Sequence, residues 1–201
     1  MDDYELESDY TVRRDNTVDE VSLSIDFPLS ETLSLTSITS WTDGELLIPE
    51  ESDGSPLRVL ELPQYGETTQ FTQDLRVTSD DTSNFNYIVG AFYSREVSDI
   101  NNIFRGFADI DANGDGQING DDCIDSGFFI CEYENSFEQI KTSYAIYADG
   151  TFELTDKVSL SAGLRYTDDE GEQNDYKSVV SGIDGTPLFN LIPGSEDLDA
   201  T

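Results

Sequence analysis

Residues 143–170, SYAIYADGTFELTDKVSLSAGLRYTDDE, decide the fold of this chain. Apolar and polar side chains alternate here with a period of two, and the alternation resumes after a turn at 155–157. A period of two is typical of a β-strand with one apolar and one polar face. The apolar face would carry Tyr144, Ile146, Ala148, Gly150, Phe152 and Leu154, then Val158, Leu160, Ala162, Leu164 and Tyr166. Each arm has about ten residues, enough for a tilted strand to cross a bilayer, and aromatic residues lie near the arm ends. The stretch predicts a hairpin of a transmembrane β-barrel.

The same alternation predicts four further arms, at about 18–27, 33–43, 67–79 and 85–96. The connections alternate between short turns (28–32, 80–84, 155–157) and long polar segments (44–66, 97–136, beyond 171). Membrane barrels have this alternation, because short periplasmic turns oppose long extracellular loops.

The predicted fold is therefore all-β: an antiparallel up-and-down meander of about six long strands, paired in sequence order. Six strands cannot close a membrane barrel, since the smallest have eight, and open sheet edges are not tolerated in lipid. The meander should be part of a larger transmembrane barrel. We assign residues 18–170 to the barrel segment, 1–17 to a preceding loop or partial strand, and 171–201 to a truncated extracellular loop.

Composition excludes several functions. The chain has 43 acidic and 10 basic residues, a formal net charge of -33 and no histidine. Nucleic-acid binding depends on Lys and Arg that neutralise phosphates, so we expect no nucleic-acid partner. Without histidine no Ser/His or Cys/His pair can form, and the acidic run 168–170 is best explained as a solvated strand end. We do not expect an enzyme.

No run of 18 apolar residues is present, so no transmembrane helix is expected. The N-terminus, MDDYELESDY, lacks the basic and apolar regions of a signal peptide. Because a barrel must be exported, we expect residue 1 to be an internal position of a longer protein.

Three segments resemble a known family: LSLTSITSWTDGE (33–45), TTQFTQDLRVTSDDTSNFNYIVGAFYSRE (68–96) and residues 143–170. They are similar to the barrel of TonB-dependent outer-membrane receptors, in which LTSIT-like, Q-E/D-L-R, Y-x-x-G-x-F-Y and L-x-x-G-L-R-Y strands follow in this order. The resemblance covers roughly residues 18–170.

This resemblance implies a 22-strand barrel with an N-terminal plug, located in the outer membrane of a Gram-negative bacterium. It implies import of siderophores or other scarce nutrients, driven by an inner-membrane energy-coupling complex that acts through the plug. The expected partners are outer-membrane lipid, the remaining strands and plug of the receptor, and that complex. The sequence does not indicate which cargo is transported.

Residues 111–122, DANGDGQINGDD, have the spacing of an EF-hand-type calcium loop. Oxygen ligands at positions 1, 3, 5, 7 and 12 would come from Asp111, Asn113, Asp115, the Gln117 carbonyl and Asp122. Gly116 would allow the sharp turn at position 6. Position 12 is Asp and not Glu, as in dockerin-like repeats, and the flanks show no clear amphipathic helices. We expect one structural Ca²⁺; the alternative is a solvated acidic loop that binds nothing.

Cys123 follows the calcium motif directly, and Cys131 lies eight positions later. Thiols on a cell surface usually pair, so we expect a disulfide beside the ion. Two free buried thiols are the alternative.

The apolar faces predict exposure to lipid for Val21, Leu23, Leu75, Val89, Ile146, Leu160 and Leu164. Asp74, Arg76 and Arg165 should lie on the opposite face, toward the lumen, and form salt bridges in the barrel wall; contact with the cargo is the alternative role. Trp41, Tyr87 and Tyr93 should belong to interfacial belts.

A second functional class stays open at this point. The acidity and the dockerin-like loop would also suit a secreted, calcium-stabilised β module used in adhesion or scaffolding. The six lipid-compatible arms argue against that class.

Overall fold

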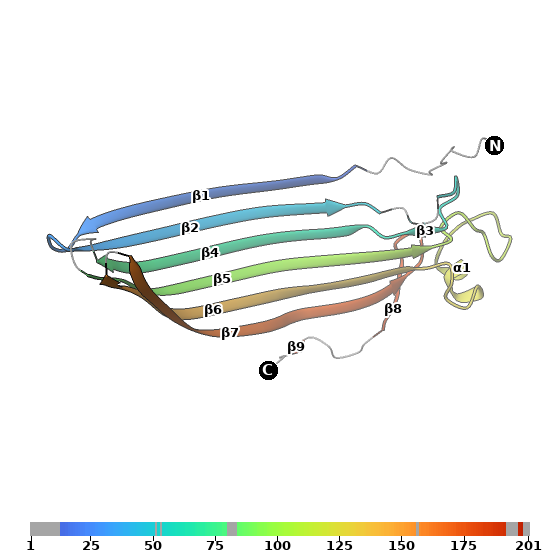
Figure 1. The fold of residues 1–201 in the computed structure, drawn as a ribbon. Helices are drawn as coiled ribbons and strands as arrows, with labels where there is room; N and C mark the ends of the chain where they lie inside the picture. Colours follow the sequence, from blue (N-terminus) through green and yellow to red (C-terminus); the bar gives the residue numbers. More distant parts are fainter. Residues whose placement is uncertain are drawn as a thin grey trace, which may run out of the picture.

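The computed structural model describes residues 13–50, 52, 54–79, 84–155 and 157–191, and the backbone of 197–198. It is a single layer of long, gently curved antiparallel strands (Figure 1). The long strands are β1 (Asp15–Pro28), β2 (Leu33–Ile48), β4 (Gln64–Ser79), β5 (Phe85–Gly106), β6 (Glu132–Thr155) and β7 (Val158–Ser181). The short elements are β3 (Leu60–Glu61), α1 (Gly120–Asp125), β8 (Pro187–Asn190) and β9 (Asp197–Leu198).

The strands pair in the order β1-β2-β4-β5-β6-β7-β8, while β3 pairs with β5 and β9 with β7. All of these pairs are antiparallel. The prediction of an all-β meander of six long strands is confirmed. Short turns favour this order because they join strands that are already adjacent.

Strand register places the alternating apolar residues that the sequence predicts for the six long strands on one side of the sheet, here called the apolar face. One row across the strands runs through Phe27, Leu35, Val77, Val89, Ala148 and Leu164. All seven residues predicted to face lipid are exposed in the structure, Leu164 most of all at 79%. The other side, here called the polar face, carries residues such as Asp74, Arg76 and Arg165.

Two aromatic rows border the apolar face. The row nearer the long connections contains Phe71, Tyr93 and Tyr144, with ring centroids 6.2 and 5.0 Å apart, and Trp41 pairs with Phe71 in register. The row nearer the short turns contains Phe85, Tyr87 and Phe152. Eight residues separate Phe85 from Tyr93, about 27 Å along a strand and about 20 Å along the normal of a tilted barrel. The rows have the spacing of interfacial girdles.

On the apolar face of β2, two polar residues, Ser37 and Thr39, lie between Leu35 and Trp41. Both bind the side chain of Gln73 on β4: Thr39 donates to Oε1 at 2.6 Å, and Nε2 donates to Ser37 at 3.0 Å. Ile38, between them, lies on the polar face, so the alternation of apolar and polar residues is interrupted here. The strand register does not shift, because the polar side chains on the apolar face satisfy one another's hydrogen bonds.

Strand ends differ from the sequence prediction at the long-connection side. The loop predicted at 97–136 spans only 107–131, and the loop predicted from 171 begins after Ser181. The prediction was wrong because charged and polar residues occur on both faces of these strand extensions and the remaining apolar residues, such as Ile100, Ile103 and Phe104, do not keep to one face. The apolar period of two therefore disappears while backbone pairing continues. Asn102, for example, still pairs with Asn135, and Asn135 with Ser178. Residues 1–12, part of the predicted preceding segment, lie outside the described residues.

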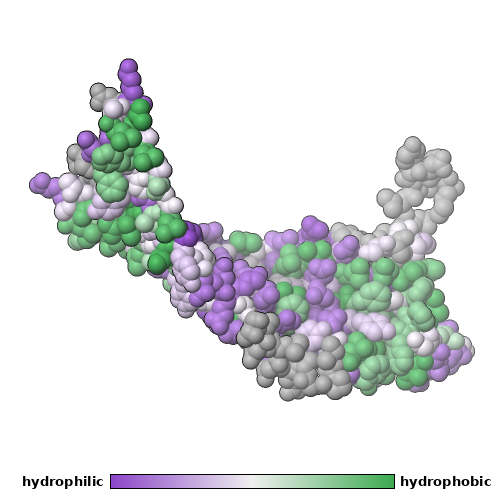
Figure 2. Space-filling view, turned by 60° about the horizontal axis from the view of Figure 1, so that its bottom comes forward, coloured by the Kyte–Doolittle hydropathy of each residue, from purple (hydrophilic) through white to green (hydrophobic). Residues whose placement is uncertain are grey.

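The sheet has almost no interior. The single hydrophobic cluster of buried residues found in the described part consists of Cys123, Cys131 and Val180, with Tyr133 and Leu188 packed against it. Figure 2 shows hydrophobic residues gathered at both ends of the visible face, with a hydrophilic zone between them. Among the described residues, no helix is long and apolar enough to cross a membrane.

Candidate functional site

The polar face of the sheet has a structured patch at membrane level. The Tyr147 hydroxyl donates to the Asp74 carboxylate, 2.9 Å from Oδ2, and crosses β5 over Gly90, where an added Cβ would collide with the Tyr147 ring. The Arg165 guanidinium carbon lies 5.7 Å from the ring centroids of both Phe92 and Tyr147.

The predicted wall of salt bridges was therefore wrong in its chemistry. Among the described residues Asp74, Arg76 and Arg165 form no ion pair with one another. A Tyr–carboxylate hydrogen bond and cation–π contacts are found instead. This geometry requires glycine at position 90, which the sequence pattern by itself did not single out.

The loop between β5 and β6 carries the predicted calcium motif. Its acidic side chains organise the backbone: Asp111 accepts from the N–H groups of Gly114 (2.6 Å) and Gly116 (2.8 Å). Asn113 accepts from the Asp115 N–H at 2.9 Å, and Asp115 accepts from the Gln117 N–H at 2.7 Å. Gly114 and Gly116 have φ of 77° and 83°, a region that favours glycine. Asn113 and Asp115, at positions 3 and 5 of the motif, thus form successive Asx turns. Asp111, at position 1, bonds to backbone N–H groups three and five residues further on.

Asp122, at position 12, closes this loop. It is fully buried, and its carboxylate accepts hydrogen bonds from the N–H groups of Asn119 (2.8 Å), Ala112 (2.8 Å) and Asn113 (3.3 Å). Asn119 caps α1 in return, accepting from the Asp121 N–H at 2.8 Å, so the two side chains form a capping box. The hydrogen bond from Asn119, helped by those from Ala112 and Asn113, lowers the pKa of Asp122 against the opposing effect of burial.

The five predicted ligand residues lie in one loop, but the side chains of Asp111, Asn113, Asp115 and Asp122 already accept hydrogen bonds from backbone N–H groups of the loop. Within the described residues, no three His, Cys, Asp or Glu side chains form a group able to hold a metal ion. The chemistry of the donor set, with three carboxylates, one amide oxygen and one carbonyl, does suit a hard cation such as Ca²⁺.

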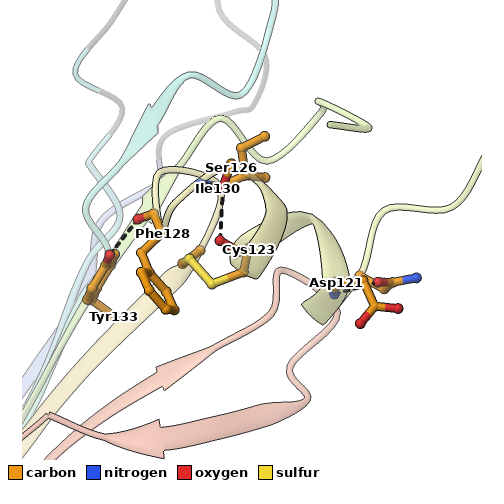
Figure 3. Close-up of a disulfide and its surroundings, with 8 residues drawn as sticks. Asp121, Cys123, Ser126, Phe128, Ile130 and Tyr133 are labelled. Atoms are coloured by element: carbon orange, nitrogen blue, oxygen red, sulfur yellow. Dashed lines mark hydrogen bonds between the residues drawn. A yellow bond between two sulfur atoms is a disulfide. The ribbon is translucent and has the colours of Figure 1, made fainter. Parts of the chain in front are cut away.

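Cys123, within α1, and Cys131, directly before β6, form a disulfide with their Cα atoms 4.9 Å apart (Figure 3). The bridged segment is also held by hydrogen bonds. The Ser126 hydroxyl donates to the Cys123 carbonyl and accepts from the Ile130 N–H, both at 3.1 Å, and the Tyr133 hydroxyl donates to the Phe128 carbonyl. The disulfide therefore ties the loop to β6.

An ion-pair group braces the neighbouring loop. Arg58 donates to Glu61 at 2.7 and 3.0 Å, and Arg105 on β5 pairs with Glu132 on β6 and lies 3.6 Å from Glu61. The Arg58 hydrogen bond, with the charge of Arg105, lowers the pKa of Glu61. No local sequence pattern predicts this group, because its members come from three separate segments.

We expect Asp122→Asn to loosen the loop, since a neutral amide is a weaker acceptor for the three N–H groups. In the wild type the folded-state pKa lies below the unfolded value of about 3.9, so this stabilisation is present above that pH. It should be lost as pH falls through the folded-state pKa.

Hydrogen exchange at Ala112 and Asn119, corrected for intrinsic rates, measures the effect. Asp121→Asn is the control, because the Asp121 carboxylate makes no hydrogen bond among the described residues. Equal loosening in both variants would contradict the assigned role of Asp122.

The architecture defines the class of protein. A meander with one apolar face, two aromatic rows, short turns at one end and long loops at the other is a segment of a transmembrane β-barrel. The family model described as TonB dependent receptor-like, beta-barrel matches residues 2–191. The chain belongs to this family, whose members are outer-membrane transporters and not enzymes.

A search of curated proteins finds no match. Among solved structures, the chain is similar to the ferric yersiniabactin uptake receptor FyuA from Yersinia pestis. The TM-score is 0.64 at 15% sequence identity, and the match covers 87% of this chain. It covers only 23% of that receptor, so this chain spans about a quarter of the length of the protein it resembles.

Proposed function

We propose that this chain is part of an energy-coupled receptor in the outer membrane of a Gram-negative bacterium, which imports siderophores or other scarce nutrients. The observation that supports the proposal most is the family match over residues 2–191 together with a sheet built to line a barrel wall. The likeness to a siderophore receptor supports the fold, and the cargo class is inferred from the family.

The full-length receptor gene, expressed in a Gram-negative strain without its own ferric-chelate receptors, provides the test. We expect accumulation of radioactive iron from at least one ferric siderophore, and loss of that accumulation when the energy-coupling complex is deleted or the proton gradient is dissipated. Uptake that does not depend on energy would indicate a passive pore and contradict the proposal.

We also propose that Asp111, Asn113, Asp115, the Gln117 carbonyl and Asp122 bind one Ca²⁺ that stabilises the loop. The ligand spacing, the Asx turns and the left-handed Gly116 support this role. A cation would also relieve repulsion, because residues 99–135 hold nine acids and one base. No group in this loop would activate a nucleophile, so the role is structural.

Calorimetric titration of the full-length receptor should show Ca²⁺ binding with Kd of about 10⁻⁴–10⁻³ M, as in extracellular modules. Asp111→Asn combined with Asp115→Asn should abolish it, because two carboxylates leave the ligand set. Asp121→Asn combined with Asp125→Asn is the matched control outside the ligand positions. Absence of calcium-dependent heat at tens of millimolar, or equal weakening in both double variants, would contradict the site.

A further inference from the structure

The polar face is not uniformly polar where the strands continue into the long-loop end. Phe137 on β6 stacks on Tyr176 on β7, with centroids 6.3 Å apart. The next tier is polar: Asn135 accepts from the Ser178 hydroxyl at 2.7 Å and the Tyr176 hydroxyl at 3.3 Å. Above it, Phe104 on β5 meets Tyr133 edge to face at 5.8 Å. In a closed barrel the polar face lines the interior. These three cross-strand groups, here called the tiers, would then lie inside the opening of the barrel at its long-loop end, here called the mouth.

The disulfide-linked loop adds further aromatic residues at this end. Phe128 meets Phe189 edge to face at 5.3 Å, and the neighbouring Phe129 is 71% exposed. Phe128 has a φ of 70°, which is rare for a bulky residue. It is held there because its N–H donates to the Cys123 carbonyl at 2.8 Å and its own carbonyl accepts from Tyr133. The loop keeps its aromatic side chains in place by fixed contacts.

The charged residues at the long-loop end limit which kind of ligand could bind there. Arg58 and Arg105 are paired with Glu61 and Glu132, and on the polar face Lys141 lies 3.4 Å from Glu96. The loop between β5 and β6, residues 107–131, holds six acids and no base. Among the described residues, no base without a carboxylate partner faces the aromatic tiers. An acidic mouth repels anions and attracts cations.

We propose that Phe104, Phe128, Tyr133 and Phe189 form part of a ligand-contact surface in the receptor mouth, and that it takes an uncharged or cationic ligand that carries aromatic rings. Aromatic faces stack on ligand rings and attract cations, and the Asn135–Ser178 tier offers hydrogen-bonding groups. The inference rests on the proposed transport function and adds a ligand class to it. The competing occupants are the plug and the other loops of the receptor.

Three ferric chelates serve as probes for the purified full-length receptor in detergent. Iron(III) tris-benzohydroxamate is neutral and aromatic, iron(III) tris-acetohydroxamate is neutral without rings, and iron(III) tris-catecholate is aromatic and trianionic. Calorimetry should show the benzohydroxamate complex binding roughly 10-fold more tightly than the acetohydroxamate complex. The catecholate complex should bind most weakly.

Phe104→Ser should weaken binding of the benzohydroxamate complex by roughly 3- to 10-fold and leave the acetohydroxamate complex unchanged. Ile103→Ser, on the opposite face of β5, is the matched control and should change neither. Phe104→Leu keeps apolar bulk without a ring and repeats the test if the Ser variant fails to fold, which heat-modifiable gel migration reports.

Equal affinity for the catecholate complex, or unchanged affinity in both Phe104 variants, would overturn the inference. Absence of binding for all three chelates would also overturn it, because the tiers would then be covered by the plug or another loop. The energy-dependent uptake assay is independent of these results. It separates failure of this inference from failure of the proposed transport function.

Discussion

Leu164→Arg is expected to destabilise the full-length receptor by about 2–4 kcal/mol, the cost of Arg on the lipid face at the bilayer midplane. Leu164 lies midway between the two aromatic rows, because four residues separate it from Leu160, the register partner of Phe152, and four from Asp168, the partner of Tyr144. It is also 79% exposed on the apolar face. Equilibrium unfolding of the receptor in lipid vesicles measures the free energy.

Leu160→Arg is the matched control. Leu160 also faces away from the polar side, but it lies in the aromatic row near the short turns, where the cost should fall to about 0–1 kcal/mol. From the sequence alone, Leu160 and Leu164 are equally good candidates for the bilayer midplane. The register of β6 and β7 distinguishes them, because it pairs Leu160 with Phe152 of the aromatic row. Equal costs at both positions, or wild-type stability of Leu164→Arg, would contradict the placement of the apolar face in lipid.

Replacing both cysteines, Cys123→Ser with Cys131→Ser, is expected to reduce the local stability of the loop by about 2–4 kcal/mol. Both cysteines are fully buried and, with Val180, make up the hydrophobic cluster of the loop end. Removing the bridge restores chain entropy to the open loop and replaces two buried sulfurs with polar hydroxyls.

Limited proteolysis of the loop in the folded receptor measures this effect, and cleavage should accelerate on the order of 30- to 1,000-fold. Global unfolding of the barrel serves as the internal control and should change little, because the cluster contacts only the ends of β6, β7 and β8. Unchanged cleavage would mean that the capping box and the ion pairs hold the loop without the disulfide. A matching loss of global stability would mean that the loop is not an independent unit.

Sequence and structure agree most closely in the membrane-spanning part of the strands. There one face must be apolar and the other polar, so the period of two is visible in residues such as Val89, Ala91 and Tyr93. The short turns then leave adjacent antiparallel pairing as the natural arrangement. The six strands, their order and their lipid-compatible face followed from these two features.

The calcium motif and the cysteine pair were also visible in the sequence, because their chemistry depends on local spacing. Local spacing defines which ligand oxygens could surround one calcium ion, but it does not define how closely those oxygens come together in the folded loop. In the structure Asp122 is occupied by three backbone N–H groups, an arrangement that depends on the fold of the whole loop. The calcium ion therefore stays a prediction.

By itself, the sequence determined the number of long strands, the two faces and the family, because hydrophobic period and turn length act over a few neighbouring residues. Only the tertiary structure decided what depends on cross-strand register. It extended β5 and β6 beyond the apolar band, placed Tyr147 over Gly90, and aligned Phe104, Tyr133, Val180 and Phe189 in one row across four strands. These residues are far apart along the chain, and no local pattern reports which of them become neighbours when the strands pair.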